Sequence, residues 1–141
     1  MASDQPTYDE VYVISDIHLG GQGDFQIFKD SQRLAWFIKH IAHLSAERKI
    51  ALVLNGDIVD FLADQDAKCF DPMRAVAKLE AVFDNLALQD VWIALRDFVR
   101  TKKRTLILVL GNHDIELALP AVTHRLLWEL CSDDESARGR I

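Results

Sequence analysis

The chain has 141 residues, of which 50% are hydrophobic and 27% charged, and its formal net charge is −6 at pH 7. This length fits one globular domain with a substantial core. The negative charge argues against a general binder of nucleic acid or of anionic membranes, because such binders usually present a basic face. The basic cluster Lys102, Lys103 and Arg104 is expected to be a solvated helix end, where cations suit the helix dipole.

Cysteine content and hydropathy indicate the cellular compartment. Cys69 and Cys131 are too few for a disulfide framework, and no stretch is long and apolar enough to predict a membrane span. Residues 1–10 are polar and acidic and lack the apolar segment of a signal peptide. We predict a cytoplasmic protein with a flexible N-terminus at 1–10, a domain at 11–131 and a polar tail at 132–141.

Three apolar runs predict the strands of a sheet. They occupy residues 11–14, 50–54 and 106–110. Each run is continuously apolar, which is typical of strands buried on both faces of a parallel sheet. The sheet is therefore expected to be parallel and to be covered by helices on both sides.

Helical patterns separate the three runs. Residues 31–45 repeat apolar side chains at three- and four-residue steps, which is one face of a helix. Asp71 followed by Pro72 predicts a helix start, Asp90 favours the cap of a further helix, and a last helix is expected at 121–130. This alternation predicts an α/β fold, with a mostly parallel β-sheet, flanking helices and right-handed crossovers.

A polar cluster that contains a glycine follows each apolar run directly. In open α/β sheets ligands bind at the carboxyl ends of the strands, so adjacent strand ends would bring these clusters together. Carboxylate, imidazole and amide oxygen without thiolate form a ligand set that suits Mn, Fe, Zn or Mg rather than a structural zinc site. The side chains expected to converge are those of Asp16, His18, Asp57, Asn112 and His113.

The spacing within these clusters suggests how metals would be held. Asp16 and His18 lie two residues apart, so both would point to the same face of a regular strand. The carboxylate of Asp57 has two oxygens and could bridge two ions, and paired ions about 3.5–4 Å apart can clamp the oxygens of a phosphoryl transfer. Gly56 and Gly111 would let the backbone turn sharply and approach a ligand closely.

Three motifs in this order resemble the calcineurin-like metallophosphoesterase family. They are DxH at 16–18, GDxxD at 56–60 and GNHD at 111–114. The resemblance extends from residue 12 to about residue 119, and three motifs at strand ends are far more specific than one. It implies that this chain is the first half of a four-layer αββα sandwich. The flanking sequence resembles bacterial members, among them the UDP-2,3-diacylglucosamine pyrophosphatase-like branch.

The resemblance implies a hydrolase with two divalent ions. A metal-activated water would cleave a phosphate ester or a pyrophosphate of a phosphorylated small molecule, with manganese the favoured ion and Fe, Zn or Mg alternatives. Asp16 and His18 would bind the first ion, Asp57 would bridge both ions, and Asn112 would bind the second.

The same resemblance implies roles for three residues near the substrate. His113 would contact the phosphate and help to protonate the leaving group, and Asp114 would orient it. Asp60 would brace its loop rather than bind metal.

The sequence departs from the family pattern because it lacks the later histidines, including a GHxH motif. Its other histidines, His40, His43 and His124, fall on helical patterns, so the second ion would have only Asp57 and Asn112. One sheet alone would also leave an apolar face uncovered, which predicts self-association or pairing with a missing C-terminal segment. We therefore expect the N-terminal portion of a longer enzyme. A non-catalytic scaffold with the same fold stays open as the alternative.

Overall fold

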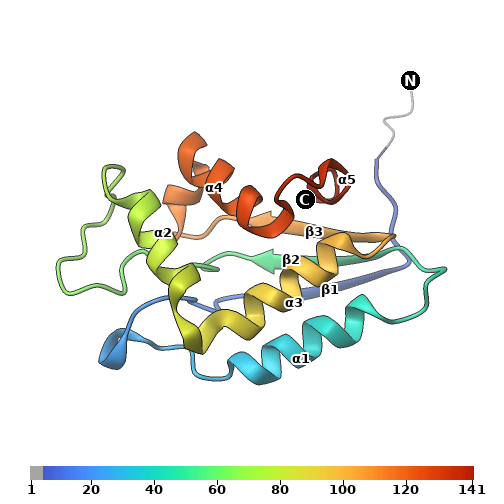
Figure 1. Ribbon diagram of the computed structural model, residues 1–141, viewed down its shortest axis with the longest axis horizontal. Coiled ribbons are helices and arrows are strands. Elements are labelled where there is room, and N and C mark those ends of the chain that lie inside the picture. The colour runs from blue at the N-terminus through green and yellow to red at the C-terminus, as the bar shows by residue number, and fades with distance from the viewer. Residues whose placement is uncertain (1–4) are drawn as a thin grey trace.

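The computed structural model describes residues 5–141, and Figure 1 shows their arrangement. The strands are β1 (Glu10–Ile14), β2 (Ile50–Asn55) and β3 (Arg104–Val109). They form one sheet in the order β1-β2-β3, and both neighbouring pairs are parallel. Each predicted apolar run is a strand whose ends lie within two residues of those expected. The predicted parallel α/β fold is therefore confirmed.

Helices and short 3₁₀ turns connect the strands. The helices are α1 (Ser31–Ala42), α2 (Ala75–Asp84), α3 (Gln89–Arg100), α4 (Pro120–Cys131) and α5 (Glu135–Arg138), and the turns are η1 (Gly23–Phe25), η2 (Leu86–Leu88) and η3 (Ile115–Ala118). Helices α1 and α3 lie side by side on one face of the sheet and pack against each other. Helix α4 packs on α3 and α2 (Figure 1). Within residues 5–141, no helix has the length and hydropathy needed to cross a membrane.

The two faces of the sheet are covered unequally. On one face Tyr12, Leu52 and Leu106 lie side by side across the strands and belong to the core shared with α1 and α3. On the other face Val11 and Val13 are 54% and 61% exposed. The expectation of strands buried on both faces is therefore wrong for β1, because α1 and α3 lie on the same side. The uncovered apolar face expected from the sequence is present along this strand.

Helix α2 begins at Ala75, later than the start predicted at Asp71 and Pro72. The Asp71 carboxylate accepts a hydrogen bond from Nε of Arg74 at 2.6 Å, so it closes a turn before the helix instead of capping it. The amide of Asp71 donates to the buried carboxylate of Glu116 at 3.1 Å. The predicted cap at Asp90 is also displaced, because α3 begins at Gln89 and places Asp90 inside its first turn.

The last ten residues, expected to be a polar tail, contain helix α5. The Asp134 carboxylate caps this helix by accepting a hydrogen bond from the amide of Ala137 at 2.9 Å. The amide of Leu106 on β3 donates to the carbonyl of Arg140 at 2.8 Å. The segment is therefore tied to the edge of the sheet, a contact that its polar composition does not reveal. Of the predicted flexible N-terminus, residues 1–4 lie outside the described residues.

Arg104 joins the start of β3 to the end of α1. Its side chain is 1% exposed, so the expectation of a solvated charge at this position is wrong. Its guanidinium donates to the carbonyls of Ala42, Leu44 and Arg48 at 2.8, 2.9 and 2.9 Å. The last carbonyls of a helix lack partners within the helix, and the five N–H groups of arginine can supply several at once.

Replacing Arg104 with methionine keeps an unbranched side chain but removes these donors and leaves the three carbonyls, that of buried Ala42 among them, without this partner. We expect Arg104→Met to lower the free energy of unfolding by about 2–4 kcal/mol. Urea denaturation followed by circular dichroism measures this change. Lys102 is exposed and serves as the control. The free energy of unfolding of Lys102→Met is expected to stay within about 0.5 kcal/mol of the parent value. Equal effects of the two substitutions would contradict the anchoring role.

Candidate metal centre

The loops that follow the three strands are hydrogen-bonded to one another. The amide of Asp16 donates to the carbonyl of Gly56 at 3.1 Å, and the amide of His18 donates to the carbonyl of Asp57 at 2.8 Å. The amide of Gly56 donates to the carbonyl of Val109 at 2.8 Å. These bonds continue the parallel pairing past the strand ends, so the polar clusters meet at the carboxyl edge of the sheet.

Three side chains of this edge leave the backbone from a left-handed conformation. Asp16, His18 and Asp57 have φ angles of 54°, 48° and 50°. Since β1 ends at Ile14, the expectation that Asp16 and His18 share one face of a regular strand is wrong. Their ligand atoms nevertheless lie within 4.8 Å of each other and of Asp57. Non-glycine residues are costly in this conformation and tend to occur where function requires a particular side-chain direction.

The Asp60 carboxylate holds two imidazole rings. Its Oδ2 lies 3.1 Å from Nδ1 of His18, and its Oδ1 lies 3.0 Å from Nδ1 of His113. The two rings meet edge to face with their centroids 4.8 Å apart. A carboxylate beside Nδ1 favours the tautomer with the proton on Nδ1, which leaves Nε2 of a neutral ring as a ligand atom. Asp60 therefore fixes the orientation of both histidines, in addition to accepting the amide of Leu62 in its own loop.

Asp114 occupies a different place from the one that the family resemblance implies. Its carboxylate is fully buried and accepts the amides of Ile58 and Gly111, each at 2.6 Å. It therefore ties two strand-end loops together through their backbones. The side chain that orients His113 in the structure is Asp60 instead, because its carboxylate is the one hydrogen-bonded to the ring.

Asp57 lies close to both histidines. Its Oδ1 accepts the amide of His113 at 2.9 Å, and its Oδ2 lies 3.9 Å from Nε2 of His18. That second distance is too long for a hydrogen bond but suits two ligands of one ion, because metal–ligand bonds of about 2.0–2.2 Å leave two ligands about 3–4 Å apart. The spacing at Asp57 is therefore compatible with a metal ligand.

Gly111 allows this close approach of two loops. A Cβ at this position would lie 2.1 Å from Oδ1 of Asp57 and 2.4 Å from its amide nitrogen. Any side chain would push the loop away from Asp57. Asn112 follows on the same loop and is exposed at this edge of the sheet.

Two groups of side chains are close enough to hold an ion. One consists of Asp16, His18 and Asp57, and the other of His18, Asp60 and His113. In the second group the Asp60 oxygens are already bonded to both Nδ1 atoms. The first group is the better ion site, because Nε2 of His18 and Oδ2 of Asp57 face each other without bonding. Its carboxylate and imidazole ligands fit a divalent transition metal or magnesium.

A family model described as calcineurin-like phosphoesterase matches residues 10–139. The chain belongs to this family. No curated protein and no solved structure matches it. Calcineurin-like phosphoesterases are typically hydrolases that use divalent metals, and the ligand cluster of this chain agrees with that chemistry. The three-stranded parallel sheet is consistent with part of the phosphoesterase fold.

The sequence predicts only a bracing role for Asp60. It does not predict the contact of Asp60 with both histidines of the candidate site. The signal available was the second aspartate of GDxxD, three residues after Asp57. The side chain of Asp60 is 3% exposed, and a buried carboxylate needs charged or hydrogen-bonding partners. In the metal-free protein the hydrogen bond that Asp60 accepts from the ring raises the pKa of His113 above its ordinary value, while burial opposes this shift.

Gly111→Ala is expected to separate the two loops and to weaken manganese binding by about 10–100-fold, as changes around metal ligands commonly do. Isothermal titration calorimetry on chelator-treated protein measures the affinity. Gly139→Ala is the matched control, since its Cβ would make ordinary contacts of 3.6 Å or more at a φ of −68°. Unchanged affinity in Gly111→Ala would show that the approach to Asp57 is not required.

Asp60→Asn is expected to lower the pKa of His113 in the metal-free protein, because the charge that favours the imidazolium is removed. The raised pKa reflects stabilisation of the protonated ring, so its loss moves the titration to lower pH. The ring Cε1–H signal, followed against pH by NMR, reports the change. Asp64→Asn in the same loop is the control and is expected to leave this titration in place.

Proposed function

We propose that the chain hydrolyses a phosphate ester or a pyrophosphate with divalent ions held at the carboxyl edge of its sheet. The observation that carries this proposal is the gap of 3.9 Å between Nε2 of His18 and Oδ2 of Asp57. Beside this gap stands His113, which Asp60 holds through Nδ1. Ligand atoms and a positioned acid–base group are thereby combined at one site.

The residues have distinct tasks in this proposal. Asp16, His18 and Asp57 hold the first ion, and Asp57 with Asn112 holds the second. When bound, the ions neutralise charge on the phosphate and make water more acidic. Manganese is proposed for both positions, since mixed carboxylate, amide and imidazole ligands accept it.

His113 is proposed to serve the leaving group. Asp60 holds its Nδ1 and favours the protonated ring, which is the form that a general acid requires. Water adds to phosphorus, the bond from phosphorus to the leaving oxygen breaks, and that oxygen takes the proton from Nε2 of His113. The attacking water gives up one proton to solvent, and His113 regains one from solvent, so the protons balance. The products are a phosphate and an alcohol, or two phosphate groups where the substrate is a pyrophosphate.

The substrate is proposed to be a phosphorylated small molecule. The sequence around the motifs resembles the UDP-2,3-diacylglucosamine pyrophosphatase-like branch, and a pyrophosphate therefore belongs among the substrates to be tested beside monoesters and diesters. A cytoplasmic location remains part of the same proposal.

The alternative function is a non-catalytic scaffold, and one observation favours it. The other histidines lie away from the edge: His40 stacks on Trp36, His43 pairs with Asp97, and His124 is exposed on α4. Within the described residues, the second ion therefore has fewer ligands than the first. This leaves open coordination positions that water would fill.

Manganese-loaded protein is expected to hydrolyse a chromogenic phosphodiester or monoester. His113→Ala is expected to lower kcat by about 10²–10⁴-fold while bound manganese is retained, because it removes a proton donor and not a ligand. Asp57→Asn is expected to lose manganese and activity together. Steady-state kinetics and elemental analysis of the same samples measure both quantities.

His124→Gln is the control, because this exposed histidine lies on α4 and outside the site. Its activity is expected to equal that of the parent. Full manganese binding without turnover of any ester or pyrophosphate would favour the scaffold. Failure to bind manganese at saturation would remove the basis of both ion sites.

A further inference from the structure

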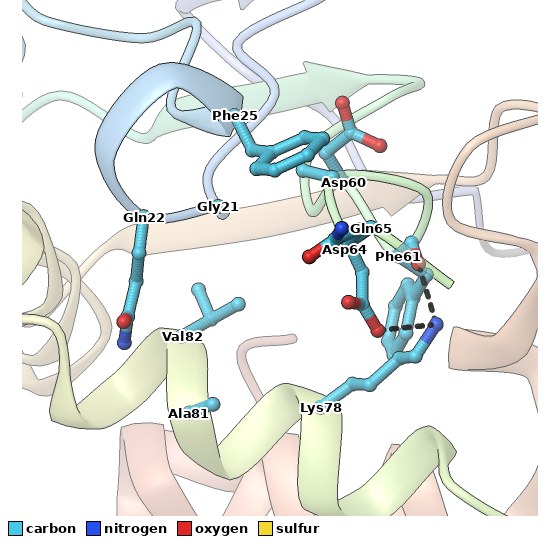
Figure 2. Close-up of a pocket in the computed structure, with 11 residues that line it drawn as sticks. Gly21, Gln22, Phe25, Asp60, Phe61, Asp64, Gln65, Lys78, Ala81 and Val82 are labelled. Carbon is cyan, nitrogen blue, oxygen red and sulfur yellow. Dashed lines mark hydrogen bonds and ion pairs between the residues drawn. The ribbon is translucent and has the colours of Figure 1, made fainter. Parts of the chain in front are cut away.

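A cavity of about 400 Å³ lies beside the metal centre, within the size range of small-molecule sites. Three segments enclose it: the loop that contains η1, the loop after Asp60, and helix α2 (Figure 2). The side chains that the argument uses are those of Gln22, Phe25, Asp64, Gln65, Lys78 and Ala81. None of these six belongs to the three motifs, but Asp60 of the motif at 56–60 also lines the cavity, so the cavity adjoins the metal centre.

One short segment separates the cavity from the metal centre. Asp60 lines the cavity, while its carboxylate holds His18 and His113. The amide of the next residue, Phe61, donates to the carbonyl of His113 at 3.2 Å, and its carbonyl accepts from Nζ of Lys78 at 3.0 Å. The cavity and the metal centre therefore share Asp60 and lie next to each other along the same short segment.

The loop over the cavity is held in a defined conformation. Gly21 has a φ of 74°, and a Cβ there would lie 2.4 Å from the carbonyl oxygen of Phe25. This tight turn folds Phe25 back over the cavity. Nδ2 of Asn85 donates to the carbonyl of Gly21 at 3.1 Å and to Oε1 of Gln26 at 3.2 Å. The wall that contains Phe25 is thus fixed by hydrogen bonds at both ends of the turn.

The charges that line the cavity compensate one another. Nζ of Lys78 lies 3.6 Å from the Asp64 carboxylate, which also lies 3.9 Å from the guanidinium of Arg74. The Asp60 carboxylate is engaged by the two histidines. A phosphate would find a single cation here, already paired, beside two carboxylates. The cavity therefore favours an uncharged group over an anion.

The remaining lining suits a ring with a polar edge. The ring of Phe25 is 46% exposed and stands at the cavity wall, opposite Ala81 and Val82 on α2 (Figure 2). Aromatic faces pack well against other flat groups. The side-chain amides of Gln22 and Gln65 offer both donors and acceptors at the border of this apolar surface.

We propose that this cavity binds the uncharged, ring-containing organic group of the phosphoester whose phosphate lies at the metal centre. The inference rests on the proposed hydrolase function and adds the class of substrate to it. Phe25 packs on the ring, and Gln22 and Gln65 bond to its polar edge. These residues set specificity and have no part in the bond cleavage.

The first test compares two diesters with the same ring-free leaving group, O-phenyl S-ethyl phosphorothioate and O-methyl S-ethyl phosphorothioate, on the manganese-loaded chain, with released ethanethiol measured by a thiol reagent. The phenyl diester is expected to have a KM about tenfold lower than the methyl diester, because its ring is buried. Ala81→Trp fills the cavity and is expected to remove this difference while kcat stays within about twofold.

Ala77→Trp is the matched control, because Ala77 is exposed one turn earlier on α2 and does not line the cavity. It is expected to leave both KM values unchanged. Phe25→Ala, paired with the exposed and non-lining Ile27→Ala, repeats the test without adding bulk to the protein. Equal KM values for the two diesters in the parent, or an unchanged ratio in both Ala81→Trp and Phe25→Ala, would overturn the inference while hydrolysis itself persists.

The second test needs neither metal nor turnover. Benzamide, an uncharged ring with an amide edge, is titrated into chelator-treated, ¹⁵N-labelled protein. The amides of Gly21 and Ala81 are expected to shift and saturate, and Ala77 to stay in place. Binding without hydrolysis in the first test supports the cavity and rejects the proposed function. Shifts that are equal at Ala77 and Ala81, or that persist in Ala81→Trp, would reject the cavity as the binding site.

Discussion

The candidate site depends on one carboxylate, that of Asp60, which accepts from two imidazole rings at once. Its oxygens lie 3.1 Å from Nδ1 of His18 and 3.0 Å from Nδ1 of His113, and the side chain is 3% exposed. A buried carboxylate is stable only when its charge is compensated by hydrogen bonds. The two imidazole rings provide these hydrogen bonds, and the same bonds fix the orientation of each ring. His18, the proposed metal ligand, and His113, the proposed acid–base group, are therefore fixed by the same carboxylate, so a change at Asp60 affects both.

The edge of the sheet provides the rigid frame for this interaction. Asp16, His18 and Asp57 adopt left-handed backbone conformations, each of which costs about 1–3 kcal/mol, and hydrogen bonds between the strand-end loops hold them there. The Asp114 carboxylate accepts hydrogen bonds from two backbone amides, one in each of two loops, and so strengthens the same frame. Gly111 permits the closest approach, where a Cβ would lie 2.1 Å from Asp57. Parallel pairing brings the loops together, and the strained residues then direct their side chains toward one another.

The cavity and the metal centre divide the recognition of a substrate between two sets of elements. The motif loops after β1, β2 and β3 provide groups for ions and phosphate, whereas the turn at Gly21 and helix α2 provide the walls of the cavity. Asp60 and Phe61 form the boundary that both share. Because α2 carries no ligand of the centre, a substitution such as Ala81→Trp can change the preferred organic group without disturbing the ions.

The sequence by itself determined the strands, the parallel sheet and the motifs at its carboxyl edge. These follow from local patterns: continuous apolar runs report burial, and polar residues with glycine report the turns that end strands. Only the tertiary structure decided that Asp60 orients His113, that Asp114 binds backbone amides, and that Arg104 is buried against the end of α1. Asp60 and His113, Asp114 and Ile58, and Arg104 and Ala42 are each more than 50 positions apart in the chain. Such partners are chosen by how helices and loops pack, so no local pattern contains them.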